Sequence, residues 1–300
     1  MPQRLPPQGE QQPDLFVTGF ADIPLRDQRD AMERPFFSLS KSPRLTPIDY
    51  QVGDVWVRVT PSAQYGMATI WDADILIWAA TQITEALDRG LSPSRKLHFH
   101  PYNLLKAIRR GANGRDYERL RDSLRRLSAT YIETNIRAKG TKRLAGFHWV
   151  ETWTEVVDDK TKETQGMTLT LPDWFYEGLV AQGGVLTIHE DYFLLTGGVE
   201  RWLYRVARKH AGNQEHGWQF TMRQLYEKSG STARFSDFAL DIRKIVTANH
   251  MPEYVLHLYR NQEGEEVVTF LRRSRLGVDN PAYELPRHPR RRIAGGIYAK

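Results

Sequence analysis

The sequence contains no cysteine among its 300 residues. This absence excludes disulfide frameworks, thiol catalysis and cysteine-based metal centres. Long apolar runs are missing as well, so we expect no membrane span. The first 34 residues are rich in Pro and Gln and lack the apolar core of a secretory signal. We therefore expect a cytoplasmic protein with a flexible arm at residues 1–34.

Catalytic motifs are also scarce. No GxxxxGK[ST] phosphate-binding loop occurs in the chain, so an ATPase is not expected. The adjacent carboxylates Asp158 and Asp159, and likewise Glu265 and Glu266, fall in predicted turns, where they are better explained as solvated side chains than as acid–base catalysts. The sequence predicts a binding protein and not an enzyme, with no cofactor and no metal.

Positive charge is present in excess and is concentrated. The net charge is +6, yet residues 95–145 contain fourteen basic and four acidic residues, which leaves the rest of the chain net negative. A localised positive field attracts polyanions and speeds their encounter with the protein. Double-stranded DNA is therefore the leading candidate partner, and a merely solvated arginine-rich face is the alternative.

The basic segment has the element order of a winged helix. A short strand at 96–100 precedes a helix that begins at Pro101, a GANG break and a helix over 115–127. The apolar residues of the last helix recur at intervals of three, four and three and form one stripe, which comprises Tyr117, Leu120, Leu124 and Leu127. Two strands at 129–138 and 146–156 then predict a hairpin with the basic tip KGTKR.

A second copy of this unit follows. It has a strand at 218–220, a helix over 221–230, the turn GSTA and strands at 254–260 and 266–273 around the turn NQEGE. Its second helix repeats the three, four, three spacing with Phe235, Phe238, Ile242 and Ile245, and Tyr254 is matched to Tyr131. The repeated order predicts an internal duplication.

The expected fold is therefore α+β, with two tandem winged-helix domains related by that duplication. We assign the first domain to residues 35–172 and the second to 173–275, followed by a basic flexible tail at 276–300. Between the two copies, a helix ending at Gly212 carries Arg201 and Arg205 beside an apolar face. These arginines either contact phosphates or form a solvated outer face.

In a winged helix the second helix of the unit enters the major groove, where arginine donates two hydrogen bonds to guanine. Arg115, Arg119 and Arg126 are the main candidates for such base contacts. Basic residues at a wing tip act chiefly on phosphates. The full set of candidate DNA-binding residues is Arg109, Arg110, Arg115, Arg119, Arg125, Arg126, Lys139, Lys142, Arg143, Arg234, Arg243 and Lys244.

Several stretches in the same order carry a family resemblance: PYNLLKAIRRGANGRDYERLRDSLRRLSATYIETNI, LPDWFYEGL, VLTIHEDYFLLTGGVERWLYRVARKHAG and LYEKSGS. Together they resemble the plasmid-encoded replication initiator protein A family over roughly residues 35–273. The resemblance implies a plasmid replication initiator that binds repeated DNA sites (iterons) at an origin. It also implies a homodimer that represses its own synthesis and recruits the host initiator and the replicative helicase.

Two other functions stay open. His98 and His100 are separated by one residue on a predicted strand and so point to the same face. Rolling-circle nicking enzymes use such a pair to hold a metal beside a nucleophilic tyrosine. The remaining ligand and the tyrosine cannot be singled out, which makes this alternative weak. A transcriptional repressor would use the same helices as an initiator, and the sequence does not separate those two functions.

Overall fold

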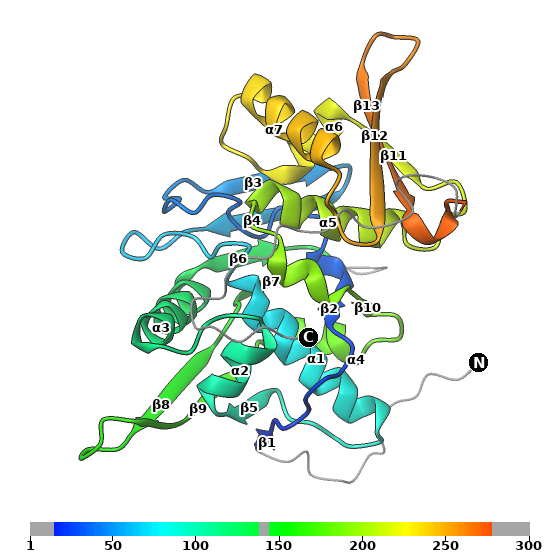
Figure 1. The fold of residues 1–300 in the computed structure, drawn as a ribbon. Helices are drawn as coiled ribbons and strands as arrows, with labels where there is room; N and C mark the ends of the chain where they lie inside the picture. The colour runs from blue at the N-terminus through cyan, green and yellow to red at the C-terminus, as the bar shows by residue number, and fades with distance from the viewer. Residues whose placement is uncertain (1–14, 138–143, 278–300) are drawn as a thin grey trace.

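The computed structural model describes residues 15–137 and 144–277. In the described residues, helices alternate along the chain with strands that form four sheets. Two winged-helix units follow one another in the sequence (Figure 1). A third group of strands packs between them. The fold is α+β, as the sequence predicted.

The first winged-helix unit is built from three helices and a three-stranded antiparallel core. Its elements are α1 (Ala73–Asp88), β5 (Lys96–Phe99), α2 (Pro101–Ala107), α3 (Gly114–Ala129), β8 (Thr152–Val157) and β9 (Thr164–Thr170). The strands lie in the order β5-β9-β8, so the strand before α2 pairs with the last strand of the wing.

The second unit repeats this arrangement. Its elements are α5 (Gly198–Ala211), β11 (Trp218–Thr221), α6 (Met222–Ser229), α7 (Phe235–Ala248), β12 (Tyr254–Arg260) and β13 (Glu266–Arg272), followed by the short helix η3 (Arg273–Arg275). The strand order β11-β13-β12 is the counterpart of β5-β9-β8. The shared topology confirms the internal duplication.

The wing of the first unit is not where the sequence placed it. The predicted hairpin does form, from β6 (Tyr131–Thr134) and β7 (Ala145–His148). These strands, however, extend β3 (Ile48–Val52) and β4 (Val55–Thr60) into a separate sheet of order β3-β4-β6-β7. The wing is the β8–β9 hairpin, so Tyr254 on β12 corresponds to the start of β8, and its match to Tyr131 was wrong.

The expected N-terminal arm is wrong for residues 15–34. β1 (Phe16–Val17) adds to β5 as a parallel edge strand, and β2 (Arg26–Gln28) pairs with β10 (Val185–Thr187). The short helix η1 (Arg29–Ala31) follows β2. The segment is ordered because Asp27 and Met32 are buried, at 3% and 0% exposure.

The first unit also extends past residue 172, where the sequence placed the domain boundary. Helix α4 (Asp173–Val180) packs against α1 and β2, and the ring of Trp174 stacks on Phe147 at 4.7 Å. The short helix η2 (Glu190–Leu194) then leads to α5, where the second winged-helix unit begins.

One continuous core supports both units. Helix α1 is buried along almost its whole length, and an aromatic cluster of Phe36, Phe37, Trp149 and Trp174 packs beside it. The buried hydrophobic residues run without interruption from this cluster to Phe238 in the second unit. Removal of apolar surface from water contributes a free energy of about 25 cal/mol per Å². This burial is the main force that holds the units together.

Two buried ion pairs join α5 to the first unit. Arg201 Nη1 donates to Asp74 Oδ1 on α1 at 2.7 Å, and Arg205 donates two hydrogen bonds to Asp27 at 2.6 and 3.0 Å. All four side chains are at most 4% exposed. Arg201 and Arg205 therefore neither contact phosphates nor form a solvated face, which corrects both expectations for this helix.

A third ionic cluster lies around Glu33. Its carboxylate is bound by Lys209 at 2.9 Å and by His210, and Lys228 on α6 lies 3.5 Å away. Burial alone would raise the pKa of Glu33. The hydrogen bond with His210 and the charges of Lys209 and Lys228 outweigh it and hold that pKa far below its usual range.

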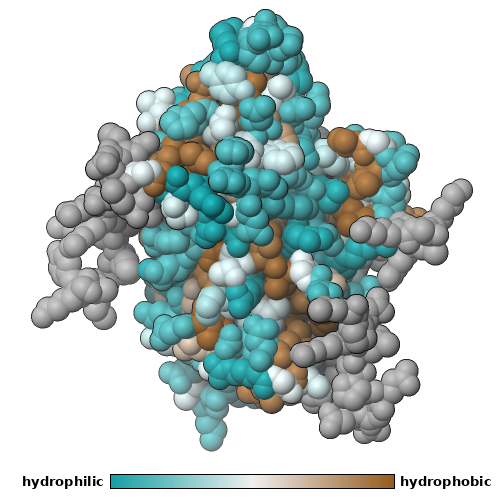
Figure 2. Space-filling model, turned by 90° about the vertical axis from the view of Figure 1, so that its right-hand side faces the viewer, coloured by the Kyte–Doolittle hydropathy of each residue, from teal (hydrophilic) through white to brown (hydrophobic). Residues whose placement is uncertain are grey.

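The outer surface is mixed. Figure 2 shows one face on which hydrophilic side chains predominate and hydrophobic ones lie in separate patches. Among residues 15–137 and 144–277, no helix combines the length and apolar composition needed to cross a bilayer.

Removing one partner of a joining ion pair leaves the other charge buried and unpaired. We expect Asp27→Ala to lower the free energy of unfolding by about 3–5 kcal/mol, measured by urea denaturation of the full chain. The double variant Asp27→Leu with Arg205→Met is the matched control and is expected to recover most of the loss. A loss below about 1 kcal/mol for Asp27→Ala would contradict the structural role of the pair.

Glu33 gives a pH-dependent expectation. Because its pKa is depressed in the folded state, its stabilisation is complete above the unfolded pKa of about 4.3 and is lost as pH falls through the folded value. The stability difference between the wild type and Glu33→Gln is expected to shrink below about pH 4, as Glu33 itself becomes protonated. Urea denaturation at each pH measures it, and a difference that grows in acid would disprove this assignment.

Candidate nucleic-acid interface

Helix α3 of the first unit has the amphipathic frame that the sequence predicted. Asn113 and Asp116 form a reciprocal capping box, in which each side chain accepts a hydrogen bond from the other residue's backbone N–H, at 3.2 and 3.3 Å. Leu120, Leu124 and Leu127 are at most 1% exposed. The charged residues therefore lie on the outer face and flanks of the helix.

Two arginines of α3 are neutralised by acids of the same helix and of β8. Arg125 donates to Glu118 at 3.1 Å and to Asp122 at 2.8 Å, and Arg121 binds Glu118 and both carboxylate oxygens of Glu155. The hydrogen bonds from Arg121 and Arg125 lower the pKa of Glu118. Arg125, a candidate DNA contact, is thus already paired within the helix.

Arg115 and Arg119 keep the solvent-facing position that was predicted. The side chain of Arg119 is 74% exposed, and its Nη1 lies 3.4 Å from Asp116 Oδ1, a long contact. Arg115 is exposed and forms no ion pair with the residues that the structure describes. These two guanidinium groups are the most available cations of α3.

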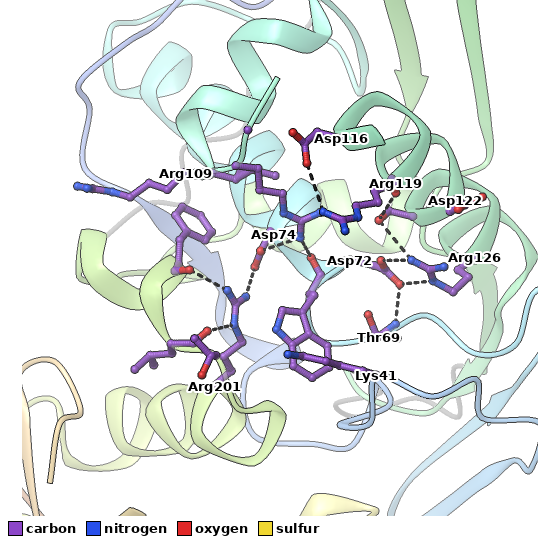
Figure 3. Close-up of a pocket in the computed structure, with 18 of the residues that line it drawn as sticks. Lys41, Thr69, Asp72, Asp74, Arg109, Asp116, Arg119, Asp122, Arg126 and Arg201 are labelled. Atoms are coloured by element: carbon purple, nitrogen blue, oxygen red, sulfur yellow. Dashed lines mark hydrogen bonds and ion pairs between the residues drawn. The ribbon is translucent and has the colours of Figure 1, made fainter. Parts of the chain in front are cut away.

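Arg126 turns inward toward Asp72 (Figure 3), and Arg110 also binds a buried acid. Arg126 donates two hydrogen bonds to Asp72 at 2.8 and 2.7 Å, and Arg110 Nη2 lies 3.0 Å from Asp74 Oδ2. The two carboxylates lie at the start of α1 and are 2% and 1% exposed, so each needs a cation. The hydrogen bonds from Arg126 to Asp72 raise the pKa of Arg126.

Arg109 occupies the turn between α2 and α3 in the left-handed region, with φ at 56°. Its Nη2 donates to Glu190 Oε2 on η2 at 2.6 Å, and its side chain is 42% exposed. Arg109 is therefore partly accessible but is already engaged with an acid.

The predicted wing residues Lys139, Lys142 and Arg143 lie outside the described residues and stay predictions. At the tip of the observed β8–β9 wing, Lys160 and Lys162 are exposed. Asp158 accepts the backbone N–H groups of Lys160 and Thr161, both at 2.8 Å, and these bonds lower the pKa of Asp158. Sequence reasoning missed the two lysines because it assigned the wing to another hairpin.

Helix α7 of the second unit presents a different surface. Phe238 and Ile242 are buried, and the opposite face carries Ser236, Leu240, Lys244 and Thr247 at helical intervals. Leu240 is 48% exposed. Lys244 was predicted, but Ser236, Leu240 and Thr247 on the same face were missed because the prediction relied on charge. The polar stripe opposite the apolar one was the available signal.

The three candidates on α7 differ in availability. Arg243 is held by Glu266 on β13 through two hydrogen bonds of 3.0 and 2.6 Å. Lys244 is 66% exposed and lies 3.5 Å from Asp241. Arg234 is exposed at the start of the helix, and the guanidinium of Arg223 lies 4.1 Å from the centre of the ring of the next residue, Phe235. Arg234 and Lys244 therefore face solvent as predicted, whereas Arg243 is tied to the wing.

His98 and His100 lie on and just after β5. His98 Nδ1 is 3.2 Å from Thr168 Oγ1. His100 Nδ1 accepts the backbone N–H of Tyr102 at the start of α2, and its Nε2 lies 3.1 Å from the Thr164 carbonyl oxygen. Both ring nitrogens of His100 are thus engaged in the fold. No group of three His, Asp or Glu side chains suited to a metal occurs among the described residues.

Comparison with known proteins gives a consistent result. The family model described as replication initiator protein A matches residues 26–256. A protein from Wigglesworthia glossinidia brevipalpis, described as a candidate replication protein, is 34% identical over 265 residues, which cover 87% of this chain and 91% of that protein.

The fold is shared with solved structures. A crystal structure of domains 2 and 3 of RctB has a TM-score of 0.57 at 12% sequence identity and covers 78% of this chain and 94% of the other. A second crystal structure of the same two domains has a TM-score of 0.50, also at 12% identity, and covers 79% of this chain and 94% of that one.

The inward position of Arg126 makes it a stabilising residue. We expect Arg126→Met to lower the free energy of unfolding by about 2–3 kcal/mol, because Asp72 loses its charged partner in a buried site. Arg115→Met, on the same helix but exposed, is the control and is expected to change stability by less than about 0.5 kcal/mol. Urea denaturation measures both variants, and equal stability of the two would refute the role given to Arg126.

Proposed function

Because the chain belongs to the replication initiator protein A family, we propose that it is a plasmid replication initiator that binds repeated double-stranded DNA sites, or iterons, at the origin. The observation that carries this proposal is the pair of winged-helix units, held to each other by buried ion pairs, each with an exposed second helix. Because the two units are linked, binding of one half-site by one unit raises the effective concentration of the other unit at the second half-site.

Helix α7 is suited to base recognition in the major groove. Lys244 donates to guanine O6 and N7, and Leu240 offers an apolar contact to the methyl group of thymine. Ser236 and Thr247 add hydroxyl groups that donate to or accept from base edges. These side chains are all exposed, and the ion pair that Lys244 forms with the exposed Asp241 is long, at 3.5 Å.

Five other exposed cations are suited to the phosphate backbone. Arg115 and Arg119 on α3, Arg234 at the start of α7 and the wing lysines Lys160 and Lys162 carry charge without a strong acidic partner among the described residues. Contacts of this kind fix the position of a protein on DNA and add affinity without much sequence choice. They also make binding depend steeply on salt.

Membership of the family also supports a proposal about the wider role of the protein. We infer a cytoplasmic homodimer that has no catalytic activity of its own and recruits the host initiator and helicase. A transcriptional repressor would use the same surfaces, and a plasmid maintenance assay dependent on the origin distinguishes the two. Failure to support replication while still binding the origin would favour the repressor.

Base and phosphate contacts respond differently to mutation. We expect Lys244→Ala to weaken binding to an origin fragment by about 1–3 kcal/mol more than binding to a scrambled duplex of equal length. The double variant Lys160→Gln with Lys162→Gln is expected to weaken binding to both duplexes alike, and to lower the slope of log K against log salt by about 1.8. Fluorescence anisotropy at several salt concentrations measures both effects.

Lys96→Gln is the matched control. Lys96 is exposed and pairs in register with Thr170, at the end of the sheet opposite the wing tip, so its removal is expected to leave both affinities unchanged. If Lys244→Ala weakened both duplexes equally, Lys244 would be a phosphate contact. If it changed neither, α7 would not be the recognition helix.

A further inference from the structure

A polar cavity of about 600 Å³ lies beside α3, where the first unit meets the segment that leads into α5. Its walls come from the start of α1, the α2–α3 turn, one flank of α3, η2 and Arg201 of α5 (Figure 3). The volume is typical of pockets that bind small ligands. Apart from Arg119, none of the DNA contacts proposed above lines it.

The acids in the cavity wall are already neutralised. Asp72 is covered by Arg126, and Asp74 is covered by both Arg110 and Arg201, at 3.0 and 2.7 Å. Because two guanidinium groups share the single carboxylate of Asp74, one positive charge remains uncompensated in the wall. At the rim, Asp122 is paired with Arg125 and Asp116 accepts the Asn113 N–H at the cap of α3.

Two further cations are available at the rim. The Nζ of Lys41 lies 5.3 Å from the centre of the Trp71 ring, and Lys41 forms no ion pair with the described residues. Arg119 points into the same space and is 74% exposed, with only its long contact to Asp116. The cavity is therefore a concave surface with excess positive charge and an aromatic wall.

We propose that this cavity is a phosphate-binding site in which Lys41 and Arg119 hold the phosphate oxygens. An arginine fork matches the geometry of phosphate and a lysine supplies a compact charge, so the pair forms charge-assisted hydrogen bonds to one group. The uncompensated charge around Asp74 adds to the attraction. The phosphate comes either from the backbone of bound DNA or from a free phosphorylated ligand.

The position of the cavity links its occupant to the rest of the molecule. The ion pair of Arg126 with Asp72 joins α3 to α1, and the pair of Arg201 with Asp74 joins α1 to α5, and both line the same space. An anion bound there contacts the elements that set the position of α3 relative to the second unit. Occupancy is therefore coupled to the geometry of DNA binding.

Sodium tripolyphosphate is a suitable probe, measured by calorimetric titration of the full chain at constant ionic strength. We expect the wild type to bind it and Lys41→Gln to bind at least tenfold more weakly, whereas the Lys96→Gln control binds as the wild type does. Tenfold corresponds to about 1.4 kcal/mol. Thermal unfolding of each variant checks that the exposed substitutions leave the fold intact.

The same variants titrated with a scrambled DNA duplex identify the source of the phosphate. If Lys41→Gln weakens both tripolyphosphate and duplex binding, the site receives a backbone phosphate. If it weakens tripolyphosphate binding alone, the site receives a free ligand. Only the duplex measurement rests on the proposed function. If the wild type bound neither the scrambled duplex nor an origin fragment, that function would be wrong, whereas tripolyphosphate binding would still support this site. Absence of tripolyphosphate binding by the wild type, or equal binding by Lys41→Gln, would overturn the site.

Discussion

Charged groups withdrawn from water must be paired, and this constraint fixes the joint between the two winged-helix units. Asp27 and Asp74 belong to the first unit and are buried, and Arg205 and Arg201 of α5 pair with them. Arg205 supplies the partner of Asp27, whereas Asp74 is shared between Arg201 and Arg110 of the first unit. Helix α5 is the first helix of the second unit, so its position orients everything that follows. The two exposed second helices are therefore carried by one body and not by two tethered ones.

Local patterns in the sequence predicted the units well. The apolar spacings of Leu120 to Leu127 and of Phe238 to Ile245 identify the two second helices because helical periodicity is a local property. Strand pairing is not local. Tyr131 follows α3 directly, as the first wing strand should, yet β6 pairs with β4 from an earlier part of the chain. Nothing within the hairpin itself indicates that partner.

The candidate site was predicted less well, because the role of an arginine depends on its partner. Arg126 binds an acid 54 positions away, and Arg205 binds one 178 positions away. Arg115 has no such acid and stays exposed. Sequence spacing does not distinguish these three arginines. The net positive charge of residues 95–145 therefore overestimates the number of cations that are free to contact DNA. Conversely, Leu240 and Ser236 were not predicted as site residues because they carry no charge, although they lie on the exposed face of α7.

The short strand β1 has a consequence for solubility. In the first unit it occupies the outer edge of β5, whereas in the described part of the second unit no strand lies against the outer edge of β11. Open strand edges offer unpaired backbone groups to other chains and promote aggregation. Trp218, 41% exposed on β11, adds an apolar surface there. The two copies of the duplicated unit thus differ in edge protection, and the second one is the more vulnerable to self-association through its sheet.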